Sequence, residues 1–145
     1  MGKRISIKEL EPDAYTAMLA LETYTQTIQI PSLLKQLIKI RASQINGCAY
    51  CIDMHTEHAL AEGESSRRIF ALSAWKDSHL FTDEEKAVLQ LTEEVTSISF
   101  QGLNDVTYRN AINFYGEKVV AQLIMQIIVI NSWNRIAVST HMIYK

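Results

Sequence analysis

The chain has 145 residues, a length that fits one domain with a hydrophobic core of its own. Its formal net charge is −2 and no stripe of basic residues occurs, which argues against nucleic acid as a partner. The longest apolar run, residues 119–130, is too short to cross a bilayer, and the N-terminus does not resemble a secretory signal, so we expect a cytoplasmic protein that does not bind membranes.

Helical patterns fill the chain from residue 12 onward. Apolar residues recur at a period near 3.6, and almost all prolines and glycines lie between these patterns. Thr82 and Glu85 match a capping box, which marks the start of one helix. We expect about seven helices, at residues 12–28, 31–46, 48–61, 65–75, 82–98, 104–115 and 117–141. With no alternating strand and no repeat, the sequence predicts an all-α fold in a single domain, residues 1–145.

The last expected helix is apolar on nearly every side, as the segment IMQIIVINSWNR at residues 124–135 illustrates. Such helices are normally buried in a large core or against another subunit. A domain of this size has limited room to surround one helix completely. The pattern therefore predicts a homo-oligomer.

Both cysteines lie in the stretch SQINGCAYCIDMH, residues 43–55. Cys48 and Cys51 are three residues apart at the start of an expected helix, and His55 lies one turn beyond Cys51, so all three are expected on one face. The two thiols can come close enough for a disulfide. A helix N-terminus lowers the pKa of a thiol, and a neighbouring histidine can take the thiol proton. The motif is therefore a candidate redox site.

Two other interpretations of the motif stay open. The cysteines can be small buried apolar side chains, with His55 a hydrogen-bonded histidine of the core. The motif can also be a zinc site made of Cys48, Cys51, His55 and His58, although four ligands within eleven residues of one helix surround a metal ion poorly. Dithiol redox chemistry fits the spacing best.

The run IKIRASQINGCAYCIDMHTEHA, residues 38–59, resembles the signature of the alkylhydroperoxidase D-like (AhpD-like) group of the carboxymuconolactone decarboxylase superfamily. The resemblance is specific across residues 34–61 and extends more weakly to residues 74–96 and 130–138. It implies an all-α, AhpD-like fold that assembles as a trimer or hexamer. It also implies a thiol-dependent peroxidase or disulfide oxidoreductase that serves antioxidant defence.

The resemblance also implies roles for the three residues. Cys51 would attack the hydroperoxide substrate and give its proton to His55, and Cys48 would condense with the resulting sulfenic acid to form a disulfide. A reductant protein that donates a dithiol, carried on a lipoyl group or similar, would restore both thiols. No bound cofactor is expected.

The sequence departs from the family pattern at two places. The best-known members of the family carry a glutamate twelve residues before the first cysteine, where this chain has Gln36. They can also carry a histidine between the cysteines, where this chain has Ala49 and Tyr50. Gln36 and Tyr50 are therefore supporting candidates. A glutamine can hold a histidine by a hydrogen bond but cannot accept its proton, so we expect a shorter proton relay and a slower peroxidase. Asp53 and Glu57 could supply a carboxylate instead, but both are expected off the face of Cys51.

Two other functions stay open on the sequence. One is a carboxymuconolactone decarboxylase-type enzyme, whose chemistry gives two thiols no role. The other is a non-catalytic oligomeric redox sensor or binding protein. The remaining histidines are expected away from the chemistry, with His58 at a solvated helix position, His79 in an exposed connection and His141 at the surface.

Overall fold

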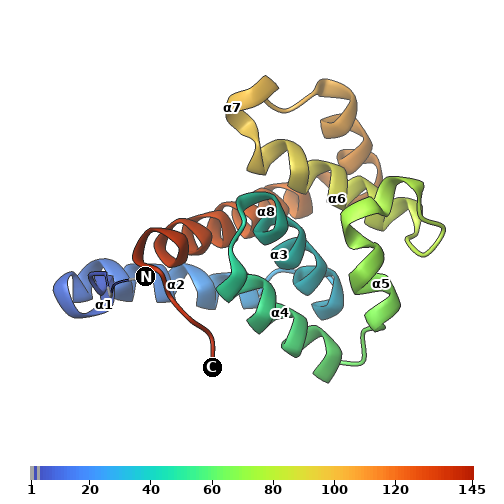
Figure 1. Cartoon of the computed structure of the whole chain (residues 1–145). Coiled ribbons are helices and arrows are strands. Elements are labelled where there is room, and N and C mark those ends of the chain that lie inside the picture. The colour runs from blue at the N-terminus through green and yellow to red at the C-terminus, as the bar shows by residue number, and fades with distance from the viewer. Residues whose placement is uncertain (1, 3) are drawn as a thin grey trace.

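The computed structural model describes residue 2 and residues 4–145 (Figure 1). Within this part of the chain there are eight α-helices, one 3-10 helix and no strand, which confirms the all-α prediction. The elements are α1 (Ile7–Leu10), α2 (Pro12–Gln26), α3 (Ser32–Asn46), α4 (Ala49–Ala61), α5 (Ser66–Ala71), η1 (Leu72–Asp77), α6 (Asp83–Thr96), α7 (Ile98–Gln101) and α8 (Asp105–Thr140).

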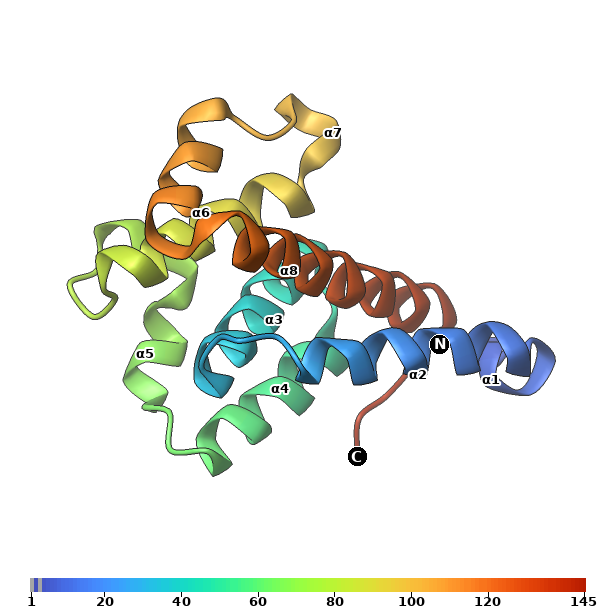
Figure 2. The ribbon, with the colours of Figure 1, turned by 180° about the vertical axis from the view of Figure 1, so that it is seen from behind.

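Helix α8 runs through the whole molecule and packs against α2, α3, α4 and α6 (Figures 1 and 2). The main core lies between α3, α6 and α8, where branched side chains from each helix are fully or almost fully buried. A second cluster joins α3 to α4, α5 and η1. Helix α3 therefore lies at the centre, and α4, which carries both cysteines near its start, packs directly on it.

Several helix boundaries follow from local chemistry that the sequence displays. The capping box at Thr82 and Glu85 is present, with each side chain bonded to the backbone of the other residue. Gly116 has φ 74° and ψ 165°, so it breaks α8 into the two helical segments expected from the sequence. The short helices α1 and α7 were not expected, because four residues are too few to display a helical period.

By length and composition alone, α8 could cross a membrane. The buried helices of soluble proteins often have the same property. Here 44% of the most apolar stretch is buried inside the molecule, against the helices named above. Its exposed side also carries large apolar side chains, of which Ile128 is 42% and Val138 44% exposed. The predicted burial of this helix is therefore found on the side that faces the other helices, whereas its other side is exposed in the single chain.

Candidate active site

The turn between α3 and α4 places Cys48 at the start of α4. Helix α3 ends at Gly47, whose φ of 65° lies in the left-handed region that glycine adopts readily, and the backbone N–H of Cys48 donates to the carbonyl oxygen of Ser43 at 2.9 Å. Cys48 is thereby the N-cap of α4, and its Sγ accepts a hydrogen bond from the backbone N–H of Cys51 at 3.3 Å. The Cys48 sulfur consequently lies at the positive end of the helix dipole.

The two cysteines are free thiols and each is 1% exposed. The Cys51 thiol donates a hydrogen bond to the Cys48 sulfur, which lowers the pKa of Cys48 to about 7 although burial opposes this. The same hydrogen bond, together with burial, raises the pKa of Cys51. The pair therefore loses its first proton near neutral pH, and the hydrogen bond between the two sulfurs holds the proton that remains.

A polar group from the far end of the chain supports the thiol pair. Asn134 of α8 is 1% exposed, and its Nδ2 donates to the Oγ of Ser43 at 2.9 Å. Its Oδ1 accepts from Nδ2 of Asn46 at 2.9 Å. The Asn134 amide also lies within hydrogen-bonding reach of both sulfurs and acts to lower the pKa of each. Nothing in the motif itself indicates this contact, because Asn134 lies more than eighty residues downstream.

His55 is 6% exposed, and its tautomer is fixed by Gln36. The Gln36 Nε2 donates to Oε1 of Glu62 at 2.9 Å, so the Gln36 amide oxygen faces the His55 Nδ1 at 3.1 Å. An amide oxygen only accepts, so the proton of the neutral imidazole resides on Nδ1 and the Nε2 lone pair is free. Burial, with a smaller contribution from Lys39 and His58, lowers the pKa of His55 to about 3. The ring is therefore neutral near pH 7.

Glu62 is the site carboxylate that sequence reasoning missed. It lies seven residues after His55, two turns along the same helix face, and that spacing was the available signal. Hydrogen bonds from Ser32 and Gln36 lower the pKa of its carboxyl. Glu57, considered above as a substitute, instead accepts a hydrogen bond from the Tyr144 hydroxyl at 2.6 Å.

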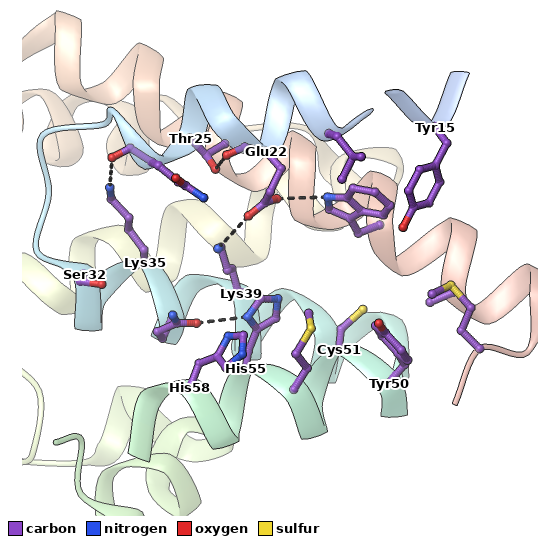
Figure 3. A pocket seen from close by; sticks show the side chains of 17 residues that line it. Tyr15, Glu22, Thr25, Ser32, Lys35, Lys39, Tyr50, Cys51, His55 and His58 are labelled. Carbon is purple, nitrogen blue, oxygen red and sulfur yellow. Dashed lines mark hydrogen bonds and ion pairs between the residues drawn. The ribbon is translucent and has the colours of Figure 1, made fainter. Parts of the chain in front are cut away.

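Cys51 and His55 lie on the wall of one cavity of about 610 Å³ (Figure 3). Tyr50, Met54 and His58 of the same helix also line it, and Gln36 lies on its floor beside His55. The structure thus brings four of the five predicted site residues, Gln36, Tyr50, Cys51 and His55, to one space.

The opposite wall of this cavity comes from α2 and α8 (Figure 3). Glu22 is its central polar residue, because its carboxylate accepts from Nζ of Lys39 at 3.1 Å and from Nε1 of Trp133 at 3.1 Å. The Tyr15 ring packs edge-on against Trp133, with 5.5 Å between the ring centroids. The wall therefore presents aromatic surface together with one ion pair.

The fifth predicted residue, Cys48, is not on this wall. We expected Cys48, Cys51 and His55 on one helix face, but Cys48 precedes the first helical residue, and its extended backbone (φ −88°, ψ 92°) directs the side chain elsewhere. The Cys48 side chain borders a second cavity, of about 680 Å³, between the start of α4 and the end of α8. The two thiols remain neighbours, but the two residues line different cavities.

Two of the other histidines also differ from expectation. His58 is exposed as expected, but it lines the cavity and packs edge-on against His55 with 5.9 Å between centroids. His141 was expected at the surface; instead it is half-buried beside the second cavity. His79 is exposed, as predicted. Across residues 2 and 4–145, no group of three or more His, Cys, Asp or Glu side chains is placed to hold a metal ion.

The helical fold agrees with comparisons to known proteins. Residues 12–94 match the carboxymuconolactone decarboxylase family. The chain is 41% identical to the YdfG protein of Bacillus subtilis (strain 168) over 139 residues, which are 96% of this chain and 95% of YdfG. The chain therefore belongs to the carboxymuconolactone decarboxylase family.

Solved structures refine this placement to the AhpD-like group. An Agrobacterium tumefaciens protein of unknown function, described as an AhpD-type antioxidant defence protein, has a TM-score of 0.95 and 34% identity and covers 99% of both chains. The debrominase Bmp8 shares the fold, with a TM-score of 0.82, 20% identity, and coverage of 92% of this chain and 72% of Bmp8. The AhpD-like resemblance read from the sequence is thus confirmed.

Proposed function

We propose that this protein is a thiol-dependent peroxidase that reduces hydroperoxides through Cys51, Cys48 and His55. The observation that carries the proposal is that Cys51 and His55 line the same cavity. The contact of Gln36 with Nδ1 of His55 leaves the lone pair of Nε2 available to accept a proton. Family membership and the likeness to an antioxidant defence protein support it.

The first half-reaction takes place in the cavity of about 610 Å³. The Cys51 sulfur attacks one oxygen of the hydroperoxide, the O–O bond breaks, and Cys51 becomes a sulfenic acid while an alkoxide leaves. The thiol proton passes to His55 Nε2 and on to the alkoxide, giving the alcohol. An imidazole with a pKa of about 3 holds the proton only briefly, which suits transfer to a strongly basic alkoxide.

The second step joins the two sulfurs. The Cys48 thiolate attacks the Cys51 sulfenic acid, an S–S bond forms, and the hydroxyl group leaves as water with one proton. The lowered pKa of Cys48 supports this role, because the thiolate is the attacking form. An external dithiol, such as a reductant protein carrying a lipoyl group, then restores both thiols by exchange, and no bound cofactor takes part.

The test is peroxide consumption by three variants with dihydrolipoamide in excess. Cys51→Ser should abolish consumption. Cys48→Ser, assayed without dihydrolipoamide, should consume about one equivalent of peroxide and stop, leaving Cys51 as a sulfenic acid that dimedone traps for detection by mass. Ala61→Ser, in the last turn of the same helix and lining neither cavity, is the matched control and should retain activity. Full activity in Cys51→Ser contradicts the proposal.

A second candidate is reductive removal of a halogen from an aromatic compound, as the name debrominase describes for Bmp8. The size of the cavity and its wall of Tyr15 and Trp133 favour an aromatic ligand over hydrogen peroxide itself. The reaction would convert two thiols and an aryl bromide into a disulfide, the debrominated ring and hydrogen bromide. Release of bromide from a tribromopyrrole, measured alongside peroxide consumption, separates the two functions.

The other functions kept open by the sequence predict different responses to thiol alkylation. A lactone decarboxylase should keep its turnover after both thiols are blocked, whereas a redox sensor should show disulfide formation without sustained turnover. We further propose a cytoplasmic homo-oligomer, a trimer or hexamer as the family resemblance implies. The exposed apolar side chain of Ile128 on α8 supports an interface there.

A further inference from the structure

The two cysteines of the site line different cavities. Cys51 lines the cavity of about 610 Å³ that holds His55, and Cys48 does not. Cys48 lines the second cavity, of about 680 Å³, and Cys51 does not. Tyr50, Ala137 and Met142 border both cavities, so these three side chains form the partition between them.

The second cavity is formed where the two ends of the chain approach the start of α4. Its far side consists of the last turn of α8 and the segment beyond it, which Figure 1 shows turning toward α4. Two contacts hold that segment in place, the hydrogen bond from Tyr144 to Glu57 and an edge-on packing of Tyr144 against Tyr50, with 5.7 Å between centroids. These contacts therefore hold one wall of the second cavity in place.

His141 on this far side has two unusual properties. Its Nδ1 is buried and has no hydrogen-bond partner among residues 2 and 4–145. Its backbone (φ 53°, ψ 48°) is left-handed, and among the described residues other than glycine no other has a positive φ. Helices commonly end in this conformation, but glycine is the usual residue there because a side chain strains it. The sequence thus places an imidazole at a costly position beside the cavity of Cys48.

We infer that the second cavity is the binding site of the dithiol reductant and that Cys48 is the sulfur that the reductant attacks. This inference rests on the proposed function, because it concerns the disulfide that function produces. Its walls are mainly apolar, with Ala49, Val138 and Ile143 among them, and they suit the hydrocarbon chain of an aliphatic dithiol. Arg4 adds a positive charge that attracts a thiolate.

The exchange balances as two displacements. A ring nitrogen of His141 takes the proton of the first reductant thiol, and that thiolate attacks the Cys48 sulfur. The bond between Cys48 and Cys51 breaks, and its electron pair leaves with Cys51, which takes up a proton. The second reductant thiol loses its proton and attacks the mixed disulfide, releasing Cys48 and a cyclic disulfide. Two electrons and two protons pass from reductant to protein.

Two exposed residues allow each cavity to be narrowed separately. Val138 is 44% exposed and lines only the second cavity, whereas Leu19 is 47% exposed and lines only the first. Val138→Trp should slow reduction by dihydrolipoamide about 10-fold or more and leave oxidation by peroxide unchanged. Leu19→Trp should slow oxidation by peroxide and leave reduction by dihydrolipoamide unchanged. His141→Gln should slow reduction by roughly 10²-fold, the size of a lost general base, without slowing oxidation.

Each half-reaction is measured alone in a single turnover, with thiols counted by alkylation and mass. Reduction is measured on protein whose disulfide was formed with diamide, so failure of peroxide chemistry does not prevent this test. In addition, brief exposure of that disulfide to a monothiol, followed by acid quenching, should leave the adduct on Cys48. An adduct on Cys51, or a Val138→Trp variant reduced at the parent rate, overturns the inference.

Discussion

The burial of His55 makes a quantitative prediction about stability and pH. Its pKa is lowered from 6.5 to about 3 in the folded protein, mainly because burial disfavours the charged ring. Between these two pH values the unfolded chain binds a proton that the folded protein does not. Folding stability therefore falls as pH falls through this window, with a limiting slope of about 1.4 kcal/mol per pH unit from this one residue.

Between pH 7 and pH 5 the expected loss from His55 alone is about 2 kcal/mol of unfolding free energy. His55→Gln removes the titrating group while keeping a polar side chain beside Gln36. The variant should therefore lose about 2 kcal/mol less than the parent on the same change of pH. The measurement is urea unfolding followed by circular dichroism at both pH values, with reductant present and the protein concentration fixed.

His79→Gln serves as the control, since it removes one imidazole from an exposed position outside the site. The reasoning fails if the parent and His55→Gln lose equal stability between pH 7 and pH 5. That result would mean that the buried ring binds its proton in the folded protein as readily as in the unfolded chain.

Three further predictions concern the relay, the end of α8 and the cavity wall. The double variant Gln36→Glu with Glu62→Gln exchanges the amide and the carboxylate while preserving the hydrogen bond between them. It should speed the oxidation of Cys51 by about 10-fold or more, because a carboxylate that accepts from Nδ1 strengthens His55 as a base. An unchanged single-turnover rate of oxidation would contradict this reasoning. His141→Gly should raise the unfolding free energy by about 1 kcal/mol and the melting temperature by about 2–4 °C, because glycine relieves the left-handed strain, whereas His141→Ala should bring no gain. Glu22→Gln weakens the ion pair with Lys39 and should raise KM for a bulky hydroperoxide several-fold more than KM for hydrogen peroxide. Equal increases in the two KM values would refute this prediction.

The helical fold was predictable because its local signals agree with one another. Apolar spacing, the capping box at Thr82 and the break at Gly116 each depend on neighbours in sequence, and the structure contains all three. The thiol pair and His55 were likewise visible, because one short helix carries them. Local chemistry therefore reveals both the helices and the centre of the site.

Contacts between distant segments were beyond the reach of the sequence. Asn134 reaches the cysteines only because α8 crosses α4, and no local pattern indicates that crossing. The position of Cys48 was misjudged for a different reason. One residue separates an N-cap from the first helical turn, and that shift alone directs its side chain to another cavity.

Helix α2 has a consequence for how tightly any ligand can be held. Thr25 is its one buried residue, although the helix provides a wall of the cavity that holds Cys51 and His55. Its position over the cavity depends heavily on the Glu22 carboxylate, which joins it to Lys39 of α3 and Trp133 of α8. A substrate binds only while α2 stays in this position, so the free energy that holds α2 there contributes to the affinity for substrate. Salt that screens the ion pair between Glu22 and Lys39 should therefore raise the Kd even of a ligand that contacts neither side chain.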